Sequence, residues 1–382
     1  MRNNLYVLLS LIVGLGVMSC STKHNASTKA PHYATLNKEQ IKPFEESGIK
    51  LSYDIICLDS TTQALLSNVN QVEIAPNRIL VYSFLEGVLI FNSNGEYVNS
   101  IAKGRAPNEI MQVNDVLYNS ADNCFEILDF QNKLKVFDLN GNYVRTKIDL
   151  GNRYSDDFIR LNDIYLFQTT SQDYTYYLIN SDKKTFKETL HLTKLIKVKD
   201  YNIINNPFAT HNDTIFCYHP GDDIIYSLSQ SNSETFEPYI QLEGLFKWGM
   251  NVDLTYTQLQ DYCKTNNVAS KIQEFNILNE NIWQMTFITG TEVYNIFLDR
   301  KNNLLYHEPI FSKIPYLGIT VGTHLKGNIN AIPFIEAIAL EESNNYTLLE
   351  NQIIRDIKAK CAEMNYKNID EGNYIIIKFN YN

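Results

Sequence analysis

Two segments of the sequence repeat each other at a fixed spacing, and this repeat limits the chain to a small set of folds. Residues 79–98 read ILVYSFLEGVLIFNSNGEYV and residues 125–144 read FEILDFQNKLKVFDLNGNYV, so a shift of 46 residues aligns them without a gap. The shift matches Phe84 with Phe130, Phe91 with Phe137, Asn94 with Asn140, Gly95 with Gly141, Tyr97 with Tyr143 and Val98 with Val144. A period in the mid-forties that contains several strand-like segments is typical of the blades of a β-propeller.

The chemistry of each repeat fits a unit of antiparallel strands. Asn94-Gly95 and Asn140-Gly141 are dipeptides that tolerate positive φ at both central positions of a tight hairpin. In each unit we expect the second strand at 79–82 or 125–128, and the third strand in the apolar run before the dipeptide. The fourth strand is expected to begin at Tyr97 or Tyr143. Residues 113–118, between the two units, are expected to form the next inner strand.

Weaker copies of the unit continue along the chain and suggest a closed ring. The further strand pairs are 163–167 with 176–180, 213–218 with 224–228, and 281–287 with 293–298. A sixth blade would combine residues 50–58 with residues 374–379, which closes the ring and protects its edges. Two insertions, 255–275 and 346–364, carry apolar residues at helical spacing, and the second is expected to pack on the ring.

The sequence therefore predicts an all-β fold over residues 49–382. This fold is a six-bladed β-propeller with two short helical insertions and closure by an N-terminal and a C-terminal strand.

The first twenty residues, MRNNLYVLLSLIVGLGVMSC, have the features of an export signal. Arg2 precedes an apolar run from Leu5 to Val17, which is too short to cross a hydrocarbon core of ~30 Å comfortably. The ending Val17-Met18-Ser19-Cys20 resembles a bacterial lipobox, after which the peptide is cut before the cysteine and the cysteine is acylated. A simple signal peptide with an incidental cysteine is the alternative. We expect a signal peptide over 1–19 and a lipidated polar tether over 20–48.

These features predict a bacterial cell-envelope protein. No other stretch approaches 18 apolar residues, so membrane contact is expected through the lipid on Cys20 alone. No acidic cluster follows Cys20, and we expect attachment to the outer membrane with the domain facing the periplasm. The formal charge of −10 argues against a nucleic-acid partner, which needs a basic face. The five other cysteines are odd in number and widely spaced, which disfavours a zinc site or a disulfide framework and leaves one disulfide open.

The stretch Ile101-Ala-Lys-Gly-Arg-Ala-Pro-Asn-Glu109, followed by a strand and the EILDFQNKLKVFDLNGNYV unit, resembles the six-bladed β-propeller lipoproteins that are related to NHL-repeat propellers. That family usually shows G-x-G-P-G-E between blades. Gly104, Pro107 and Glu109 keep this pattern, whereas Ala106 and Asn108 replace two glycines. The resemblance implies the fold and the location, and it implies no single activity.

Motifs of known enzymes are missing from the sequence. HExxH, GxSxG, a Walker loop and GxGxxG after a strand do not occur, and the Asn94-Gly95 and Asn140-Gly141 segments lack the distal Glu of a calcium loop. The sequence therefore identifies no catalytic residue, and we predict no metal site and no cofactor. Calcium in the channel is the alternative. Asn and Asp residues recur before strands, where they suit turns and would also serve as calcium ligands. They are Asn114, Asp115, Asn162, Asp163, Asn212, Asp213 and Asn330.

Loops on one face of a propeller are the expected binding surface. The candidate binding residues in these loops are Arg105, Glu109, Asp129, Asn132, Asp222 and Asp223. A structural alternative exists for two of them, because Glu109 would cap backbone amides between blades and Asp129 would hold its own turn.

We expect a non-catalytic module that binds a protein, a peptide or a glycan at this face. The alternatives are a scaffold beside a transport system and a metal-dependent hydrolase or lyase with ligands in the channel.

Overall fold

The computed structural model describes most of the chain after residue 31. The described residues are 32–35, 41–61, 63–168, 176–180, 185–189, 208–218, 224–229, 232–243, 256–266, 271–289, 292–302, 304–307, 329–344, 348–363 and 373–381. The expected signal peptide and Cys20 lie outside these residues. Within the described residues, no helix has the length and apolar composition needed to cross a bilayer.

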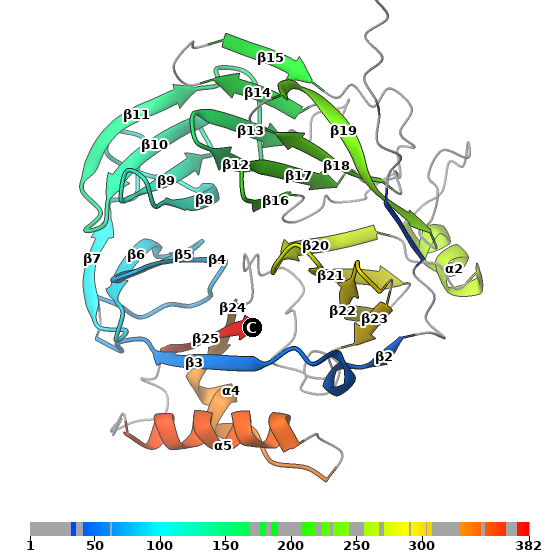
Figure 1. The fold of residues 1–382 in the computed structure, drawn as a ribbon. Helices are drawn as coiled ribbons and strands as arrows, with labels where there is room; N and C mark the ends of the chain where they lie inside the picture. The colour runs from blue at the N-terminus through cyan, green and yellow to red at the C-terminus, as the bar shows by residue number, and fades with distance from the viewer. Residues whose placement is uncertain are drawn as a thin grey trace, which may run out of the picture. The chain divides into compact units, whose positions relative to one another are not determined.

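Six antiparallel sheets form a ring, as the repeat predicts (Figure 1). We number the blades along the chain and call their strands A to D from the inside outwards. Blade 1 consists of β4 (Gln71–Ala75), β5 (Arg78–Ser83), β6 (Gly87–Asn92) and β7 (Tyr97–Ile101). Blade 2 consists of β8 (Val113–Asn119), β9 (Cys124–Asp129), β10 (Lys133–Asp138) and β11 (Tyr143–Asp149). Blade 3 consists of β12 (Asp157–Leu161), β13 (Ile164–Gln168), β14 (Tyr176–Asn180) and β15 (Thr185–Thr189).

Blades 4 and 5 each carry a fifth strand from the N-terminal segment. Blade 4 consists of β16 (Phe208–His211), β17 (Thr214–Tyr218), β18 (Ile224–Ser229) and β19 (Asn232–Glu243), with β1 (His32–Thr35) parallel to β19. Blade 5 consists of β20 (Lys271–Ile277), β21 (Ile282–Thr289), β22 (Glu292–Asp299) and β23 (Leu304–His307), with β2 (Lys42–Pro43) parallel to β23.

These extra strands correct the expected extent of the tether. A 3-10 turn, Phe44–Ser47, follows β2, and the Phe44 ring is buried 4.9 Å from the Phe297 ring. The part of the expected tether from His32 onwards therefore belongs to the propeller, because it covers the outer edges of two sheets.

The first helical insertion is shorter than expected. Helix α2 covers Tyr256–Asn266, and residues 271–275, which the predicted helical insertion included, belong to the inner strand of blade 5, β20 (Lys271–Ile277). Ile272 and Phe275 fit helical spacing, and they also pair in the strand across a register shift, so spacing alone misplaces this boundary.

Blade 6 closes the ring as predicted. Strand β25 (Tyr374–Tyr381) lies between β24 (Ile329–Pro333) and β3 (Leu51–Cys57) and pairs with both in antiparallel fashion. Helix α4 (Phe334–Ala339), which the sequence did not predict, and helix α5 (Leu348–Glu363) cover this sheet. Ile353, Ile354 and Ile357 of α5 are fully buried in one cluster with the sheet, so α5 takes the place of a fourth strand.

The expected Asn-Gly turns are present in a different conformation. Gly95 and Gly141 have φ of 87° and 82°, whereas Asn94 and Asn140 do not have positive φ. The Asn92 side chain accepts hydrogen bonds from the backbone N–H groups of Asn94 and Glu96, and Asp138 holds the second turn in the same way. The hairpin is therefore wider than two residues and needs one left-handed glycine.

These glycines also let each blade approach the preceding one. A Cβ atom on Gly95 would lie 2.0 Å from the carbonyl oxygen of Cys57 in blade 6, and one on Gly141 would lie 2.8 Å from Ile90 Cδ1 in blade 1. The same contact thus recurs at two interfaces of the ring.

Replacing Gly95 with alanine should destabilise the ring strongly. The left-handed conformation alone costs about 1–2 kcal/mol for an alanine, and the clash with the Cys57 carbonyl adds to this cost. Gly151→Ala is the matched control, since Gly151 has a φ of 61° and open space around its Cα. Urea denaturation should give a loss for Gly95→Ala that is at least about 2 kcal/mol larger than for Gly151→Ala, and equal losses would contradict the close-approach argument.

Candidate functional site

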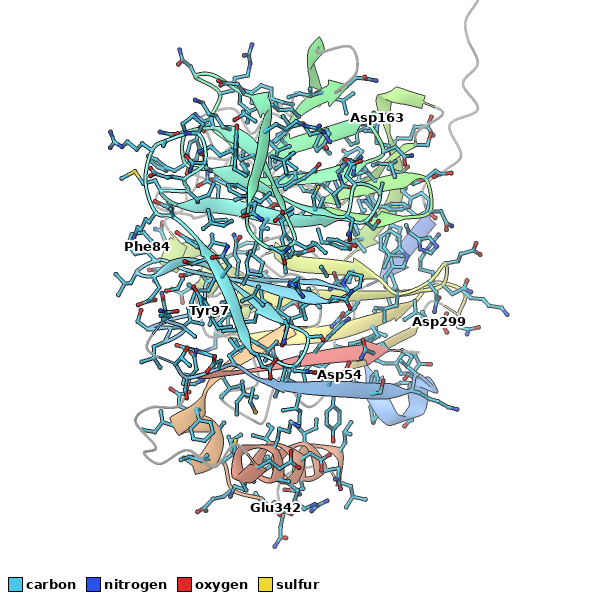
Figure 2. All side chains as sticks on the ribbon, turned by 90° about the vertical axis from the view of Figure 1, so that its left-hand side faces the viewer. Asp54, Phe84, Tyr97, Asp163, Asp299 and Glu342 are labelled. Carbon is cyan, nitrogen blue, oxygen red and sulfur yellow. The ribbon has the colours of Figure 1, made fainter. Side chains whose placement is uncertain are left out.

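The predicted binding loops of blades 1 and 2 lie together on one face of the propeller. In an antiparallel blade, the B–C loop and the D–A link to the next blade leave from the same end of the strands. Lys103, in the link between blades 1 and 2, donates to the carbonyl groups of Phe84 and Leu85 in the B–C loop of blade 1 at 3.0 and 3.2 Å. Figure 2 shows Phe84 on one side of the ring and Asp299, in a C–D turn, on the other.

A buried ion pair organises these loops between blades 1 and 2. Lys135 Nζ lies 2.8 Å from Asp129 Oδ2, and both side chains are 1% exposed. Lys135 also donates to the carbonyl group of Glu109 at 2.7 Å. Asp129 accepts a hydrogen bond from the backbone N–H of Lys133 at 3.0 Å. The geometry therefore supports the structural alternative for Asp129, which holds its own turn and neutralises a buried lysine.

Glu109 is also used within its own loop. Its carboxylate accepts a hydrogen bond from the backbone N–H of Ala106 at 2.9 Å. The same carboxylate lies against Gly104, where a Cβ atom would come within 1.9 Å of Oε2. The Gly and Glu of the linking motif are thus needed together, because the glycine leaves room for the glutamate that caps the loop.

The other predicted residues differ in their surroundings. Asn132 has a φ of 61° and donates to the carbonyl group of Gly151 at 3.2 Å, so it forms part of a turn. Arg105 is exposed, and its Nε–H points to the Met111 sulfur at 3.5 Å. Asp222 and Asp223 lie outside the described residues. Arg105 is thus the predicted residue whose charge is offered to solvent.

Large apolar side chains are exposed beside Arg105. They are Phe84 (53% exposed), Leu85 (63%), Met111 (40%) and Phe130 (50%), and together with Lys103 and Arg105 we call them the loop patch. Phe84 and Phe130 occupy equivalent positions of the repeat, and the Phe130 backbone N–H donates to the Gln112 carbonyl group, next to Met111. The patch therefore extends from blade 1 to blade 2.

The backbone beneath the loop patch is held firmly. Besides the two bonds from Lys103, the Phe84 N–H donates to Asn70 Oδ1 at 2.8 Å. The Glu86 carboxylate accepts hydrogen bonds from Ser83 and Ser67. Burial alone would raise the pKa of Glu86, but these hydrogen bonds hold it below its usual value. The loop thus keeps its apolar side chains in water because its backbone and its acid are fixed.

The recurring Asn and Asp residues serve as turns and as links between blades. Asn162 and Asn212 have φ of 53° and 50°, as expected for hairpin turns. Asn114 accepts a hydrogen bond from Gln71 of blade 1 through its carbonyl group and donates from its side chain to Ser155 beside blade 3. Asp115 accepts a hydrogen bond from the Phe158 N–H at 3.1 Å.

In the described part of the chain, one group of acidic and thiol side chains is close enough to share a cation, namely Asp122, Cys124 and Glu126. Glu126 is already in contact with Lys147 at 3.0 Å and with the Tyr165 hydroxyl at 2.8 Å. Burial and the Glu126 charge raise the pKa of the Cys124 thiol to about 11. We interpret the group as an ion-pair network that ties blade 2 to blade 3.

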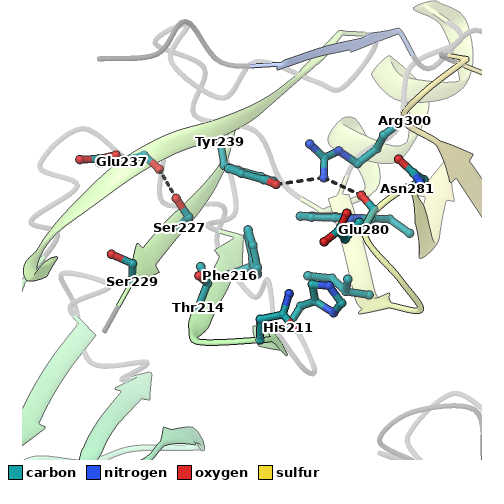
Figure 3. Close-up of a pocket in the computed structure, with 13 residues that line it drawn as sticks. His211, Thr214, Phe216, Ser227, Ser229, Glu237, Tyr239, Glu280, Asn281 and Arg300 are labelled. Atoms are coloured by element: carbon teal, nitrogen blue, oxygen red, sulfur yellow. Dashed lines mark hydrogen bonds between the residues drawn. The ribbon is translucent and has the colours of Figure 1, made fainter. Parts of the chain in front are cut away.

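A cavity of about 470 Å³ lies between blades 4 and 5 (Figure 3). Its lining includes His211 and Asn212 of an A–B turn and Arg300 of a C–D turn. These turns lie at the ends of the strands opposite to the loop patch. The cavity is therefore on the face that the sequence prediction did not consider.

Arg300 is fixed at the wall of this cavity. Its Nη1 donates to the Tyr239 hydroxyl and to the Glu280 carbonyl group, both at 3.0 Å. The guanidinium lies over the Tyr239 ring at 4.7 Å and over the Trp283 ring at 5.3 Å. The residues that line the cavity are far apart in the sequence, so no local motif could predict it. The sequence signal that was present is an arginine in a turn beside strands rich in aromatic residues.

The fold is a six-bladed β-propeller. Three of its sheets have four strands, two have five and one has three, and loops and turns cover both faces of the ring. The chain belongs to the family described as a domain of unknown function (DUF4934), whose model matches residues 34–316.

The chain is similar to two solved structures from Bacteroides species. A Bacteroides fragilis NCTC 9343 protein that carries the name of an exported protein is 15% identical, with a TM-score of 0.58, and the match covers 92% of this chain and 100% of that chain. A member of the DUF4221 family from Bacteroides vulgatus is 10% identical, with a TM-score of 0.43, covering 68% and 86%. Among curated proteins, none matches this sequence.

The free energy of unfolding should distinguish the buried ion pair, which stabilises the fold, from the exposed Arg105, which does not. Lys135→Met leaves the Asp129 carboxylate buried without its cation, and we expect a loss of about 3–5 kcal/mol in the free energy of unfolding. Arg105→Gln removes an exposed charge and should change stability by less than about 0.5 kcal/mol. Urea denaturation of both variants measures this contrast, and a stable Lys135→Met protein would reverse our assignment of Asp129.

Proposed function

We propose that this chain is a non-catalytic binding module of the bacterial cell envelope that holds a protein or peptide partner on its loop patch. The chain would be anchored by lipid at Cys20 in the outer membrane, with the propeller facing the periplasm. The proposal assigns the ring a scaffolding role and places recognition in loops that the ring holds in position.

The loop patch is the observation that carries this proposal. Isolated exposed apolar residues are ordinary, but four large ones in adjacent loops form the kind of patch that marks a protein interface. Their backbone is fixed before any partner arrives, so binding would order few residues and lose little conformational entropy. Aromatic and methionine side chains are also the types enriched in the centres of interfaces.

The charge around the patch specifies the partner further. Lys103 and Arg105 are exposed at the patch, whereas the nearby carboxylates of Glu86 and Glu109 are engaged in hydrogen bonds within their own loops. These carboxylates keep their charge but use their oxygens within the loops, so Lys103 and Arg105 are the charged groups of the patch left to pair with a partner. A segment that combines apolar side chains with acidic groups is complementary to the patch in shape and charge.

The export signal and one similar structure support the location. The Val17-Met18-Ser19-Cys20 ending resembles a lipobox, and the Bacteroides fragilis protein with the same fold carries the name of an exported protein. Two acyl chains or more would hold the chain at a membrane stably.

Lipidation is tested by metabolic labelling with an alkyne analogue of palmitate in a bacterial host. We expect the label on the full chain and none on Cys20→Ser, while Ser21→Ala, which leaves the cysteine in place, keeps it. Label that persists on Cys20→Ser would contradict an anchor at this residue.

Recognition by the loop patch is tested with surface variants. Photo-crosslinking from Phe84 in the producing cell identifies a partner, which is then purified and titrated against the propeller. Phe84→Ser combined with Phe130→Ser should weaken this binding at least about tenfold, because both side chains would lie at the centre of the interface. Val144→Ser is the matched control, since Val144 is 52% exposed on the outer strand of blade 2.

Two further measurements decide the class of partner. Lys103→Glu with Arg105→Glu should weaken binding and reduce its dependence on salt, as expected when charges guide association. Vesicles of anionic phospholipid that bind the propeller through Phe84 and Phe130, in place of any protein, would overturn the proposal in favour of membrane contact. Equal binding by the paired serine variant and Val144→Ser would also overturn it.

A further inference from the structure

We propose that the cavity between blades 4 and 5 binds a neutral saccharide unit. The cavity lies on the face opposite to the loop patch, so this inference does not rest on the proposed function. Its volume of about 470 Å³ falls in the range of small-molecule sites, which is roughly 300–1,000 Å³.

Two residues of the cavity lining carry buried polar atoms that lack the partners that burial normally requires. Among the described residues, no hydrogen-bond partner reaches Arg300 Nε or His211 Nε2, and both atoms are buried. A buried polar atom without a partner costs roughly 1–3 kcal/mol, and both residues that carry such an atom belong to the lining of this cavity. An arginine Nε–H can only donate, so it needs an oxygen acceptor, and hydroxyl groups of a ligand supply this.

The arginine is held in place for such contacts. Two hydrogen bonds from Nη1 and the stacking on Tyr239 and Trp283 fix the guanidinium plane. The Phe216 ring packs edge-on against both aromatic rings, at 4.8 and 5.1 Å between centroids. A donor that is already ordered loses little entropy on binding.

The balance of charge favours a neutral ligand over an anion. Arg300 is accompanied at the cavity by two acidic residues, Glu237 and Glu280, both exposed. A phosphate or carboxylate would meet these two negative charges as well as the arginine. The net charge of the lining therefore argues against an anionic ligand.

The remaining polar groups suit hydroxyl groups in particular. Three hydroxyl side chains and two amides line the cavity, namely Thr214, Ser227, Ser229, Asn212 and Asn281. Hydroxyl and amide groups both donate and accept hydrogen bonds. A sugar presents several hydroxyls of the same dual character around an apolar ring, so it matches this lining better than a purely donating or purely accepting ligand.

The test uses saturation-transfer NMR and calorimetric titration of the full chain with the methyl glycosides of glucose, galactose, mannose and N-acetylglucosamine. At least one glycoside should bind saturably. Arg300→Gln should weaken that binding roughly tenfold or more, which corresponds to the loss of a charged hydrogen-bond donor.

A second variant guards against loss of folding. Asn212→Gly removes an amide from the cavity but keeps the left-handed turn, because glycine accepts a φ of 50° without strain. It should weaken binding about threefold or more with an unchanged melting temperature. Arg145→Gln, at an exposed position of blade 2, and Phe84→Ser, in the loop patch, are controls that should bind the glycoside like the parent chain.

Failure of all four glycosides to bind overturns the proposal, as does binding that Arg300→Gln and Asn212→Gly leave unchanged. Binding of citrate or inorganic phosphate in their place would identify an anion site and also overturn it. Because Phe84→Ser affects the loop patch alone, a failed saccharide titration leaves the proposed partner binding untouched, and the reverse also holds.

Discussion

The pairing of β3 with β25 is the interaction on which the whole ring depends. Each blade packs on its two neighbours. The ring is stable when a strand from the N-terminal part of the chain and the C-terminal strand pair in one sheet, because this pairing closes the ring. Residues from both strands enter the apolar clusters on either side, where Ile376 packs towards blade 1 and Ile375, Ile377 and Phe379 pack towards α5. Tyr53 of β3 donates to Asp356 of α5 at 2.6 Å, so the helix that replaces a fourth strand is fixed by a polar contact as well as by its buried face.

Two of the charged loop residues that the sequence analysis selected as binding candidates, Asp129 and Glu109, stabilise the fold. Lys135, Asp129 and Glu109 are drawn into one network at the junction of blades 1 and 2, because a linking loop without regular pairing needs other partners for its backbone groups. The proposed binding surface is formed by the exposed residues of the same loops. Phe84, Leu85 and Phe130 carry no motif, but the network beneath them keeps them exposed in a defined position.

The sequence predicted the fold in outline because the repeat is local. Blades 1 and 2, the closing strands and helix α5 follow from periodicity, and their boundaries agree with the structure to within a few residues. The N-terminal strands β1 and β2 could not be predicted, since short parallel pairing at a sheet edge leaves no pattern in the strand itself. The conformation of the Asn-Gly turns depends on the side chains of Asn92 and Asp138, outside the dipeptides. The cavity is formed by His211, Tyr239 and Arg300, which meet through packing of two blades and share no spacing that a sequence could display.

The register of blade 6 has a consequence for the connectivity of the fold. Leu51 and Tyr381 are direct partners across β3 and β25, so the two ends of the closing strands lie side by side. A short hairpin from Tyr381 to Leu51 would join the six sheets from Leu51 onwards into a covalent circle, with loss of the edge strands β1 and β2 that precede Leu51. The packing of the blades therefore does not depend on the order in which they follow one another in the sequence. A circular permutant whose termini lie in an exposed loop elsewhere would form the same interfaces between blades.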